Sequence, residues 1–343
     1  MLLALDATYS LGRNLSGVGV YSREVLFGLA RAHPSQKFLF YYRPHRFLRS
    51  LKDSLPGNAR RRVLRGVPGG AVFHALNQRV DVPGHRTVCT FHDLFVMTGE
   101  YSSPEFRERF TAQARHAAAR SDLIIAVSQF TARQVEGLLH VEASRIRVIP
   151  HGARRPLRYT GPAETARRER LILTVGAIQK RKNVGRLVRA FERTPRGWRL
   201  AIAGAADGYG AEEELRAVEE SPRRGDIDVL GYVDDARLEE LYARASIFAF
   251  PSLDEGFGMP VLDAMARGVP VVGSRRSAVP EVAGEAALLV DPESVEELGE
   301  ALRQLVGDEH MRADLAIRGR ERAAGFTWER AVEHTWRVYQ ELL

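Results

Sequence analysis

Two short runs of the sequence combine residue types that could bind an anion and a polar ligand. The first is EGFGMPVLDAMARG, from Glu255 to Gly268, which follows an apolar segment. Gly256 and Gly258 allow the backbone to approach a ligand, and Pro260 suits the first turn of a helix, whose free amides would then face a phosphate. Those amides belong to Phe257, Gly258 and Met259. Glu255 could accept hydrogen bonds from the ligand's hydroxyl groups, and the alternative is an ordinary strand-to-helix turn with a solvated acid.

The second run is VGAIQKRKNVGRLVRAF, from Val175 to Phe191, and it opens a helix near Asn183. Arg181 and Lys182 stand just ahead of that helix, where two cations could neutralise a diphosphate without a metal ion. Fixed cations near an oxygen on which negative charge grows would stabilise a transition state more than the ground state. The alternative for this run is a solvated basic turn.

Short apolar strands alternate with helical patterns along the whole chain, which is typical of parallel sheets covered by helices on both faces. We predict strands in the first half at 2–6, 37–42, 71–75, 87–92, 123–127 and 145–149, and in the second half at 171–175, 199–203, 227–230, 247–250, 269–273 and 287–290. The clearest predicted helices are 22–32, 105–120, 184–193, 212–220, 235–243 and 295–305.

The pattern predicts an α/β protein of two Rossmann-like domains with a ligand cleft between the carboxyl ends of their sheets. We place the first domain at 1–155, a proline-containing charged linker at 156–170 and the second domain at 171–325. The last segment, 326–343, is amphipathic and is expected to form a helix that packs back on the first domain. Its apolar face would carry Trp328, Val332, Trp336 and Tyr339.

Composition narrows the class of protein further. The 343 residues carry a net charge of +7, which is uneven because residues 1–150 alone hold 21 Lys and Arg against 11 Asp and Glu. A basic first half favours an anionic partner such as a phospholipid surface. An equally good explanation is that these charges are simply solvated on the surface.

The single cysteine, Cys89, lies in an apolar run and indicates a reducing compartment. With no signal peptide or membrane span in view, we expect a cytoplasmic protein, and peripheral attachment at the inner face of a membrane stays open.

The two runs, their order and their spacing resemble glycosyltransferase family 4, whose members have the GT-B fold. Other segments extend the resemblance over nearly the whole chain. They are SGVGVYSREVL (16–26), TFHDL (90–94), SDLIIAVSQFTAR (121–133), RVIPHGA (147–153), LGYVDDARLEELYARASIFAFPSLDEGFG (230–258) and SAVPEVAGEAALLVDP (277–292). The resemblance implies an acceptor-binding first domain and a second domain that binds a nucleotide diphosphate sugar.

The resemblance also implies roles for single residues. Arg181 and Lys182 would bind the donor diphosphate, and Glu255 the sugar hydroxyls. The ribose would be bound by Asp263, where the family normally has glutamate, and Ala177 stands where many members have arginine. Further donor contacts would come from the glycine loop, from the backbone beside the base, and from the phosphate-binding turn. These residues are Gly17, Gly19, Tyr232, Val233, Gly256, Phe257, Gly258 and Met259.

His92 would lie beside the donor sugar, where it could bind the sugar or help the acceptor lose its proton. Without the resemblance, a histidine that ends a strand is more often structural. For His74, a structural role and a place in the cleft wall are equally expected. The near-fingerprint at Gly17 lacks its third glycine, so a nicotinamide cofactor is not expected. Asp226 and Asp228 form a D-x-D pattern that should point into solvent, so we expect no metal and no cofactor.

The function that this resemblance implies is retaining, metal-independent transfer of mannose or another hexose from a nucleotide diphosphate sugar. A saccharide or lipid-linked acceptor is expected, in cell-envelope polysaccharide or glycolipid synthesis, and no nucleic acid. Two alternatives stay open. A nucleotide-sugar epimerase of the same fold would convert the donor without an acceptor, and a catalytically silent subunit would bind the sugar nucleotide but would be expected to lack Glu255, Arg181 or Lys182.

Overall fold

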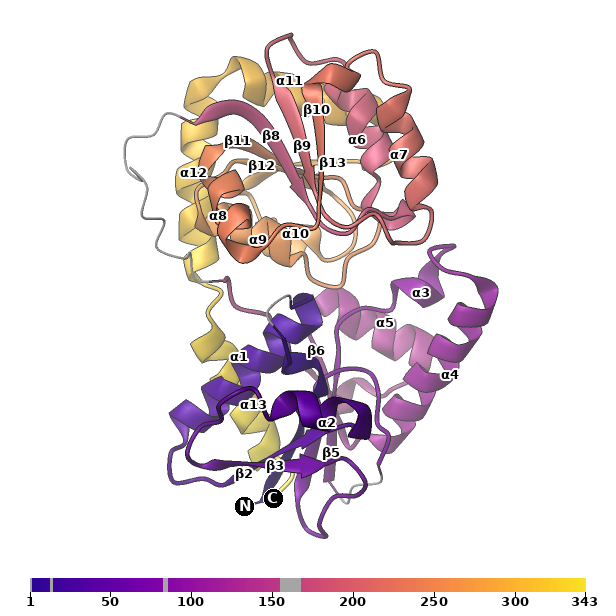
Figure 1. Ribbon diagram of the computed structural model, residues 1–343, viewed down its shortest axis with the longest axis vertical. Helices are drawn as coiled ribbons and strands as arrows, with labels where there is room; N and C mark the ends of the chain where they lie inside the picture. The colour runs from indigo at the N-terminus through magenta and orange to yellow at the C-terminus, as the bar shows by residue number, and fades with distance from the viewer. Residues whose placement is uncertain (1, 13–14, 83–85, 155–167) are drawn as a thin grey trace. The chain divides into compact units, whose positions relative to one another are not determined.

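The computed structural model describes residues 2–12, 15–82, 86–154 and 168–343 (Figure 1). The chain forms two compact units. The first consists of residues 1–98, 104–152 and 326–343, and the second of residues 99–103 and 153–325. The predicted linker at 156–170 lies outside the described residues except for its last three positions.

The first unit is built on a parallel sheet of seven strands in the order β3-β2-β1-β4-β5-β6-β7. Its strands are β1 (Leu3–Asp6), β2 (Phe38–Tyr42), β3 (Ala59–Val63), β4 (Val72–Ala75), β5 (Arg86–Phe91), β6 (Leu123–Ala126) and β7 (Ile146–Val148). Its helices are α1 (Gly17–Ala32), α2 (Pro44–Ser50), α3 (Phe95–Thr98), α4 (Pro104–Arg120), α5 (Gln129–Leu139) and α13 (Trp328–Gln340), with short 3-10 turns η1 (Thr8–Ser10) and η2 (Ala143–Arg145).

Successive residues of these strands face two different cores, as the alternation of side chains along a strand requires. Leu3 and Leu5 of β1 join a cluster with α1 and α13, whereas Ala4 joins the cluster on the other face with α4 and α5. Cys89 of β5 is fully buried in that second cluster. The first sheet is therefore covered on both faces, as the apolar strands predicted.

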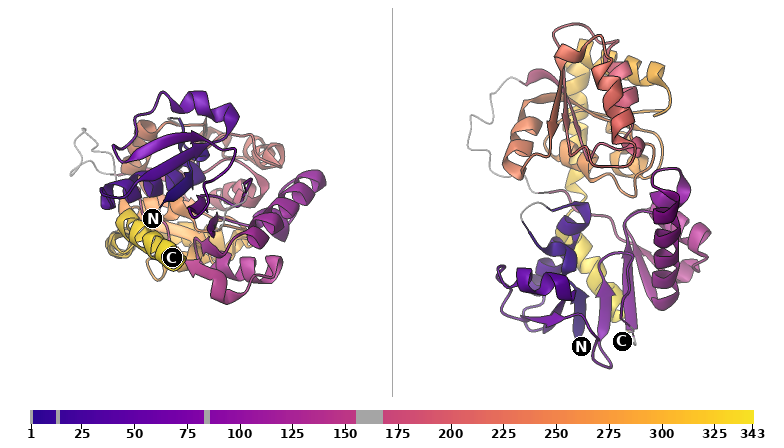
Figure 2. Two further views of the ribbon diagram at one scale, coloured as in Figure 1. Left: turned by 90° about the horizontal axis from the view of Figure 1, so that it is seen from below. Right: turned by 45° about the vertical axis from the view of Figure 1, so that its right-hand side comes forward.

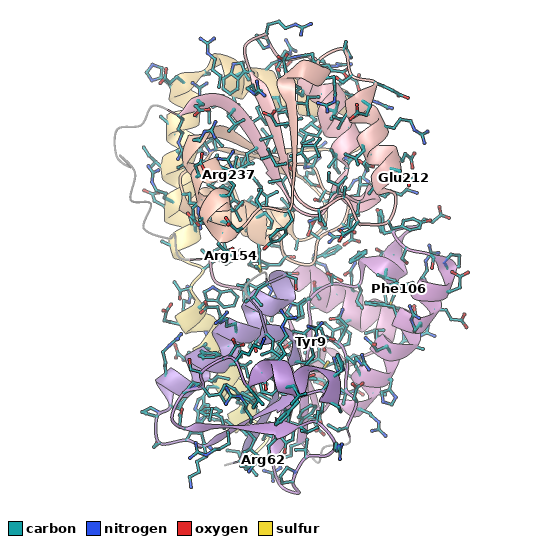
Figure 3. The ribbon with its side chains drawn as sticks, in the orientation of Figure 1. Tyr9, Arg62, Phe106, Arg154, Glu212 and Arg237 are labelled. Atoms are coloured by element: carbon teal, nitrogen blue, oxygen red, sulfur yellow. The ribbon has the colours of Figure 1, made fainter. Side chains whose placement is uncertain are left out.

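Strand β3 was not predicted, because its sequence ARRRV carries three successive arginines. It is an edge strand that pairs with β2, and only Ala59 is buried. Arg60 and Arg62 point outward, and Arg62 is labelled at this edge in Figure 3. Edge strands often carry charge, which opposes pairing with a further strand, so an apolar pattern is a poor guide to them.

The C-terminal helix α13 belongs to the first unit, where it packs along α1 (Figure 2). The two helices approach most closely at Gly28, where an added Cβ would lie 2.5 Å from a methyl group of Val332. His33 stacks on Trp336 with ring centroids 3.5 Å apart. The predicted apolar face of this helix is confirmed, since Trp328, Val332 and Tyr339 are buried and Trp336 partly so.

The second unit has a parallel sheet of six strands in the order β10-β9-β8-β11-β12-β13. Its strands are β8 (Glu169–Val175), β9 (Arg199–Ala203), β10 (Ile227–Gly231), β11 (Ala245–Phe250), β12 (Val271–Ser274) and β13 (Ala287–Val290). Its helices are α6 (Val184–Phe191), α7 (Ala211–Glu219), α8 (Asp235–Arg244), α9 (Met259–Ala266), α10 (Val279–Ala283), α11 (Val295–Gly307) and α12 (Glu309–Ala324), with turns η3 (Lys180–Lys182) and η4 (Arg224–Asp226).

In Figure 1 helices α6 and α7 lie on one side of this sheet, and α8 and α12 on the other. The predicted strands of the second half are confirmed within a few residues at their ends. None of the helices in the part of the chain that the structure describes is long and apolar enough to cross a membrane.

Candidate active site

The candidate site lies where β8 and β11 end, in the loops that follow their carboxyl ends. After β8 the chain passes through Gly176 and forms the turn η3, and Asn183 then adopts a left-handed backbone with φ of 61°. The Asn183 side chain donates to the carbonyl oxygens of Pro251 at 2.9 Å and Pro292 at 2.7 Å. The Leu253 amide also donates to the Arg181 carbonyl at 2.7 Å. The loops after β8 and β11 are therefore held to each other by buried hydrogen bonds.

These loops bring the three predicted residues Arg181, Lys182 and Glu255 into direct contact. One Glu255 oxygen, Oε1, accepts a hydrogen bond from Arg181 Nη1 at 2.9 Å and another from Lys182 Nζ. Arg181 Nη1 also donates to the Asp254 carbonyl at 2.9 Å. The three side chains are largely buried, with exposures between 9% and 12%. Residues from two separate sequence runs thus form one compact charged cluster.

The cluster keeps Glu255 ionised. Burial alone would favour the neutral acid, but the charges of Arg181 and Lys182 outweigh it and hold the pKa of Glu255 below its ordinary value. Lys182 also lies over the Phe250 ring, 4.7 Å from its centroid, in a cation–π contact. Two cations share one carboxylate, so the cluster has a surplus positive charge that a phosphate can bind.

Helix α9 begins beside this cluster in the way that the sequence predicted. Gly258 caps the helix with φ of 98°, a conformation that favours glycine, and Pro260 is in the first turn. No described residue accepts a hydrogen bond from the amides of Gly258 and Met259. Gly268 follows the helix with φ of 64° and ends it. The start of α9 can therefore offer backbone amides and the positive end of the helix dipole to an anion.

Asp263 lies on α9, is buried, and is bound by two arginines. The Arg154 amide donates to Asp263 Oδ1 at 2.9 Å, and the Arg154 guanidinium lies 3.6 Å from Oδ2. Arg267 lies 3.7 Å from Oδ1. Arg154, which Figure 3 labels, also pairs with Asp235 at 3.4 Å. Burial raises the pKa of Asp263, and the two arginines oppose that rise. The Asp263 carboxylate is thus already bound by Arg154 and Arg267, and a ribose hydroxyl would share it with these two arginines.

The predicted base-binding segment follows β10. Gly231 has a φ of 65°, and its carbonyl accepts from the Gly204 amide at 2.8 Å. Tyr232 is 56% exposed, and α8 begins three residues further on, at Asp235, with Asp234 as its cap. The backbone of Tyr232 and Val233 therefore lies in a short connection at the carboxyl end of the sheet, where a planar ring can reach it.

In the first unit, His92 is buried directly after β5. Its Nε2 lies 2.9 Å from the Leu76 carbonyl oxygen, which can only accept, so Nε2 carries the proton and Nδ1 is the acceptor. Burial lowers the pKa of His92 to about 4. The ring of Tyr21 meets it edge-on at 4.7 Å, and His151 stacks on it at 5.5 Å. A neutral imidazole held in one tautomer can accept a proton or a hydrogen bond.

Gly17 and Gly19 lie in the first turn of α1, which begins at Gly17 and not at Ser22 as predicted. Ser16 caps the helix and accepts from the Gly19 amide at 3.3 Å. A Cβ at Gly19 would lie 3.0 Å from the Tyr9 carbonyl oxygen, so this turn packs tightly against η1. The segment that looked like a glycine loop is therefore the start of a helix, and donor contact by its glycines stays a prediction.

Comparison with known proteins identifies the family. Residues 162–322 match the family described as Glycosyl transferases group 1, and residues 30–154 match Glycosyltransferase Family 4. The O-antigen chain mannosyltransferase B of Escherichia coli is 33% identical over 283 residues, which cover 79% of this chain and 74% of that protein. The chain belongs to the family 4 glycosyltransferases. It also matches longer mannosyltransferases, of which it spans about a third.

Solved structures of other proteins share the fold of this glycosyltransferase. The sucrose-phosphate synthase of Thermosynechococcus elongatus matches with a TM-score of 0.78 and 20% identity, over 100% of this chain and 99% of that one. Anabaena HepE in complex with UDP-glucose matches with a TM-score of 0.71 and 18% identity, over 99% of both chains. The fold is GT-B, as the resemblance implied.

The glycosyltransferase uses His74 structurally. His74 Nε2 lies 2.8 Å from the Thr90 hydroxyl and Nδ1 lies 2.6 Å from the Tyr339 hydroxyl, and Thr90 shares a further hydrogen bond of 2.9 Å with Tyr21. Both ring nitrogens are therefore occupied. This buried network joins α1, β4, β5 and α13, and it resolves the question that the sequence left open for His74.

The acidic D-x-D pattern also has a structural use. Asp226 pairs with Arg223 at 2.9 Å, and Asp228 pairs with Arg199 at 2.6 Å. Within residues 2–12, 15–82, 86–154 and 168–343, no three His, Cys, Asp or Glu side chains gather as a metal site would require.

Three partners of the site were not predicted: Arg154 and Arg267 beside Asp263, and the Asn183 side chain that ties the loops. Arg154 meets Asp263 across 109 positions of sequence. Only Asn183 offered a local signal, because asparagine tolerates the left-handed conformation better than most residues do.

Acid should unfold the first unit of this enzyme. Burial lowers the pKa of His74 to about 3 and of His92 to about 4, and the pKa of His151 lies well below its ordinary value. Each binds its proton more readily when unfolded, so below pH ~6.5 the free energy of unfolding should fall by about 1.4 kcal/mol per pH unit for each histidine. Melting temperature measured between pH 7.5 and 5 tests this.

His151→Gln should make the acid dependence shallower, whereas the exposed His116→Gln should leave it as steep as in the wild type. A melting temperature that stays level over this range would contradict the assignment of neutral buried histidines.

Proposed function

We propose that this glycosyltransferase moves a hexose, mannose foremost, from a nucleotide diphosphate sugar to a saccharide or lipid-linked acceptor, retaining the anomeric configuration. The observation that carries the proposal is the cluster in which Glu255 binds Arg181 and Lys182, beside the start of α9. The mannosyl donor is supported by the relative that bears the name O-antigen chain mannosyltransferase. A nucleotide diphosphate sugar is supported by the UDP-glucose in the Anabaena HepE structure.

The proposed chemistry follows from the charges. The bond between the anomeric carbon and the phosphate oxygen breaks, and negative charge grows on that oxygen. Arg181, Lys182 and the amides of Gly258 and Met259 would bind it there, and their fixed positions would make them most effective in the transition state. These cations support a metal-independent reaction. Glu255, ionised and buried, would accept hydrogen bonds from the sugar hydroxyls.

Retention would arise by attack on the same face of the sugar. The acceptor oxygen forms a bond to the anomeric carbon as the phosphate leaves, and the acceptor's proton passes to a phosphate oxygen of the departing nucleotide diphosphate. His92, with Nδ1 as its acceptor nitrogen, would orient the sugar or the acceptor hydroxyl. The basic first half of the chain favours an anionic acceptor or a peripheral contact with the inner face of a membrane in cell-envelope synthesis.

The test is a panel of nucleotide diphosphates and their sugars in a thermal-shift assay. The matched donor should raise the melting temperature by mass action, with a nucleotide diphosphate mannose expected to give the largest shift. Product formed from that donor and a mannose-containing acceptor is then examined by NMR for the anomer, with and without a chelator. If the donor alone were isomerised, the protein would be an epimerase, and if no member of the panel shifted the melting temperature the proposal would fail.

Asp263→Asn should raise the KM for the donor about tenfold or more with little change in kcat, because a hydrogen bond from the ribose to a charged group contributes to donor binding. Asp235→Asn is the matched control, since it removes the other carboxylate that pairs with Arg154 and leaves Asp263 in place. A variant at Asp263 that loses kcat and keeps its KM would show that this residue does not act through the donor.

A further inference from the structure

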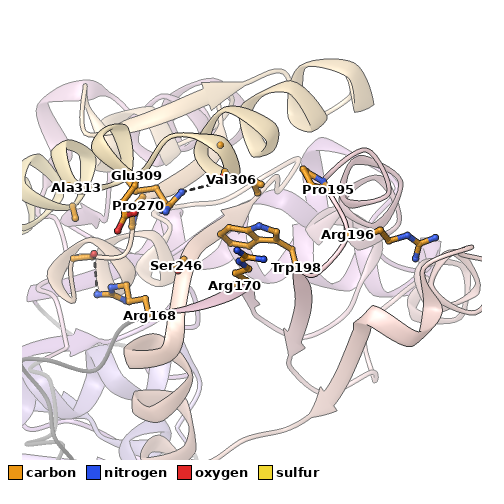
Figure 4. Close-up of a pocket in the computed structure, with 14 residues that line it drawn as sticks. Arg168, Arg170, Pro195, Arg196, Trp198, Ser246, Pro270, Val306, Glu309 and Ala313 are labelled. Atoms are coloured by element: carbon orange, nitrogen blue, oxygen red, sulfur yellow. Dashed lines mark hydrogen bonds between the residues drawn. The ribbon is translucent and has the colours of Figure 1, made fainter.

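A pocket with mixed polar and apolar lining lies in the second unit (Figure 4). None of its described lining residues belongs to the donor cluster. Its volume is about 810 Å³. Several of its residues stand at the amino ends of strands, where Arg168 precedes β8 and Trp198 precedes β9. The donor cluster follows the carboxyl ends of β8 and β11. Because β8 extends from Glu169 to Val175, the two sites lie about 20 Å apart along that strand.

Four arginines line this pocket: Arg168, Arg170, Arg196 and Arg312. Among its described lining residues the acid is Glu309 alone, in the first turn of α12. Further positive charge comes from Arg320, whose guanidinium lies against Gly268 in the pocket wall. The lining therefore has a strong surplus of positive charge.

The carboxylates of the described residues compensate little of this charge. Arg168 donates to four backbone carbonyls, at Tyr242, Ala245, Arg267 and Gly268, over distances of 2.7 to 3.2 Å. These are neutral acceptors, and burial together with the charge of Arg320 lowers the pKa of Arg168. Its position is thus fixed by hydrogen bonds, and no carboxylate of the described residues pairs with it.

Arg312 and Arg170 add to the surplus. Arg312 donates to the Val306 carbonyl at 3.2 Å and lies over the Trp198 ring at 5.8 Å. Arg170 is exposed and has no hydrogen bond or ion pair with a described residue. Its neighbour Glu169 points to the other face of the strand, where it pairs with Arg244 at 2.7 Å. Among the described carboxylates, one pairs with a pocket arginine: Asp226 lies 3.4 Å from Arg196, and that arginine is 75% exposed.

We propose that this pocket is a binding site for a soluble phosphate-bearing anion, separate from the donor site. Arg170, whose guanidinium makes no hydrogen bond with a described residue, can bind phosphate oxygens with paired hydrogen bonds. The charges of the other arginines around the same pocket favour a multiply charged group over a single carboxylate. The four arginines come from the start of β8, the loop before β9, and α12, so the fold itself brings them together. Sugar transfer is not needed for this binding.

The test follows the indole NMR signals of the full-length protein, labelled with ¹⁵N at tryptophan, as inorganic pyrophosphate is added. The chain has three tryptophans, and Trp198 lines the pocket while Trp328 and Trp336 belong to the first unit. We expect the Trp198 signal, assigned with Trp198→Phe, to move saturably. Sodium chloride at equal ionic strength should leave it in place. Lys182→Met should keep this response, which separates the pocket from pyrophosphate bound at the donor cluster.

Charge variants make the test sharper. Arg170→Ala should weaken the binding measured at Trp198 about ten- to hundredfold, whereas Glu309→Gln should tighten it. Arg216→Ala, an exposed arginine of α7 outside the pocket, should have no effect. The proposal is overturned if pyrophosphate at millimolar concentration leaves Trp198 unmoved, if Arg170→Ala binds like the wild type, or if only anionic lipid vesicles and not pyrophosphate move the signal.

Discussion

Replacing Lys182 by methionine should lower kcat for sugar transfer by about 10²- to 10³-fold, with a much smaller effect on stability. Lys182 Nζ binds Glu255 and lies over Phe250, so the protein holds its charge in place before the donor arrives. A fixed cation needs no rearrangement as negative charge grows on the leaving phosphate oxygen. Methionine keeps much of the apolar side chain but removes that charge. Steady-state kinetics with the matched donor measure the loss.

Lys180→Met is the matched control, because Lys180 belongs to the same turn but makes no contact with Glu255 in the structure. It should keep kcat within a few fold of the wild type. Lys182→Arg should recover part of the lost rate, since it restores charge with altered geometry. Equal rates for Lys182→Met and Lys180→Met would contradict the role given to the cluster.

Gly204→Ala should be among the most destabilising single substitutions in the second unit. A Cβ at this position would lie 1.9 Å from the Gly176 carbonyl oxygen and 2.5 Å from its carbon. Both are backbone atoms at the end of β8, so no side chain can move aside to relieve the clash. We expect a cost of about 3 kcal/mol, seen as a melting temperature lower by roughly 5–10 °C.

The same substitution should weaken donor binding, because the Lys182 side chain lies against Gly176. A shift of Gly176 would therefore move one of the cations of the site. Gly225→Ala serves as the control, since an added Cβ there meets nothing within 4 Å. If Gly204→Ala had the same stability and donor affinity as Gly225→Ala, the segments that follow β8 and β9 would not be closely packed.

Much of this architecture follows from local sequence patterns. The central strands of both sheets, such as β1, β5 and β11, could be predicted because each is buried on two faces and so forms a continuous apolar run. The same reasoning failed at β3, whose arginines lie on an exposed edge, and at the start of α1, where Gly17 and Gly19 looked like a turn. Glycine disfavours a helix interior, but the Ser16 cap and close packing against η1 override that preference here.

The site itself was predicted in its charged residues and not in their partners. Glu255, Arg181 and Lys182 each follow a strand in a recognisable run, so parallel strand order brings them to one edge of a sheet. Their direct contact, and the way that Arg154 and Arg267 hold Asp263, depend on side-chain packing over long sequence separations. No local pattern encodes such contacts.

Helix α13 has a consequence for how the protein matures. Its buried residues complete the core of the first unit, and Tyr339 closes the hydrogen-bonded network at His74. During synthesis, the ribosome must add the residues from 153 to 325 before this helix emerges. At ~5–20 residues per second the amino-terminal sheet and α1 would wait roughly 10 to 35 seconds without the part of their core that α13 supplies. We therefore expect a chaperone to bind the nascent first unit. The second unit needs no later segment, because all of its residues precede α13 in the chain.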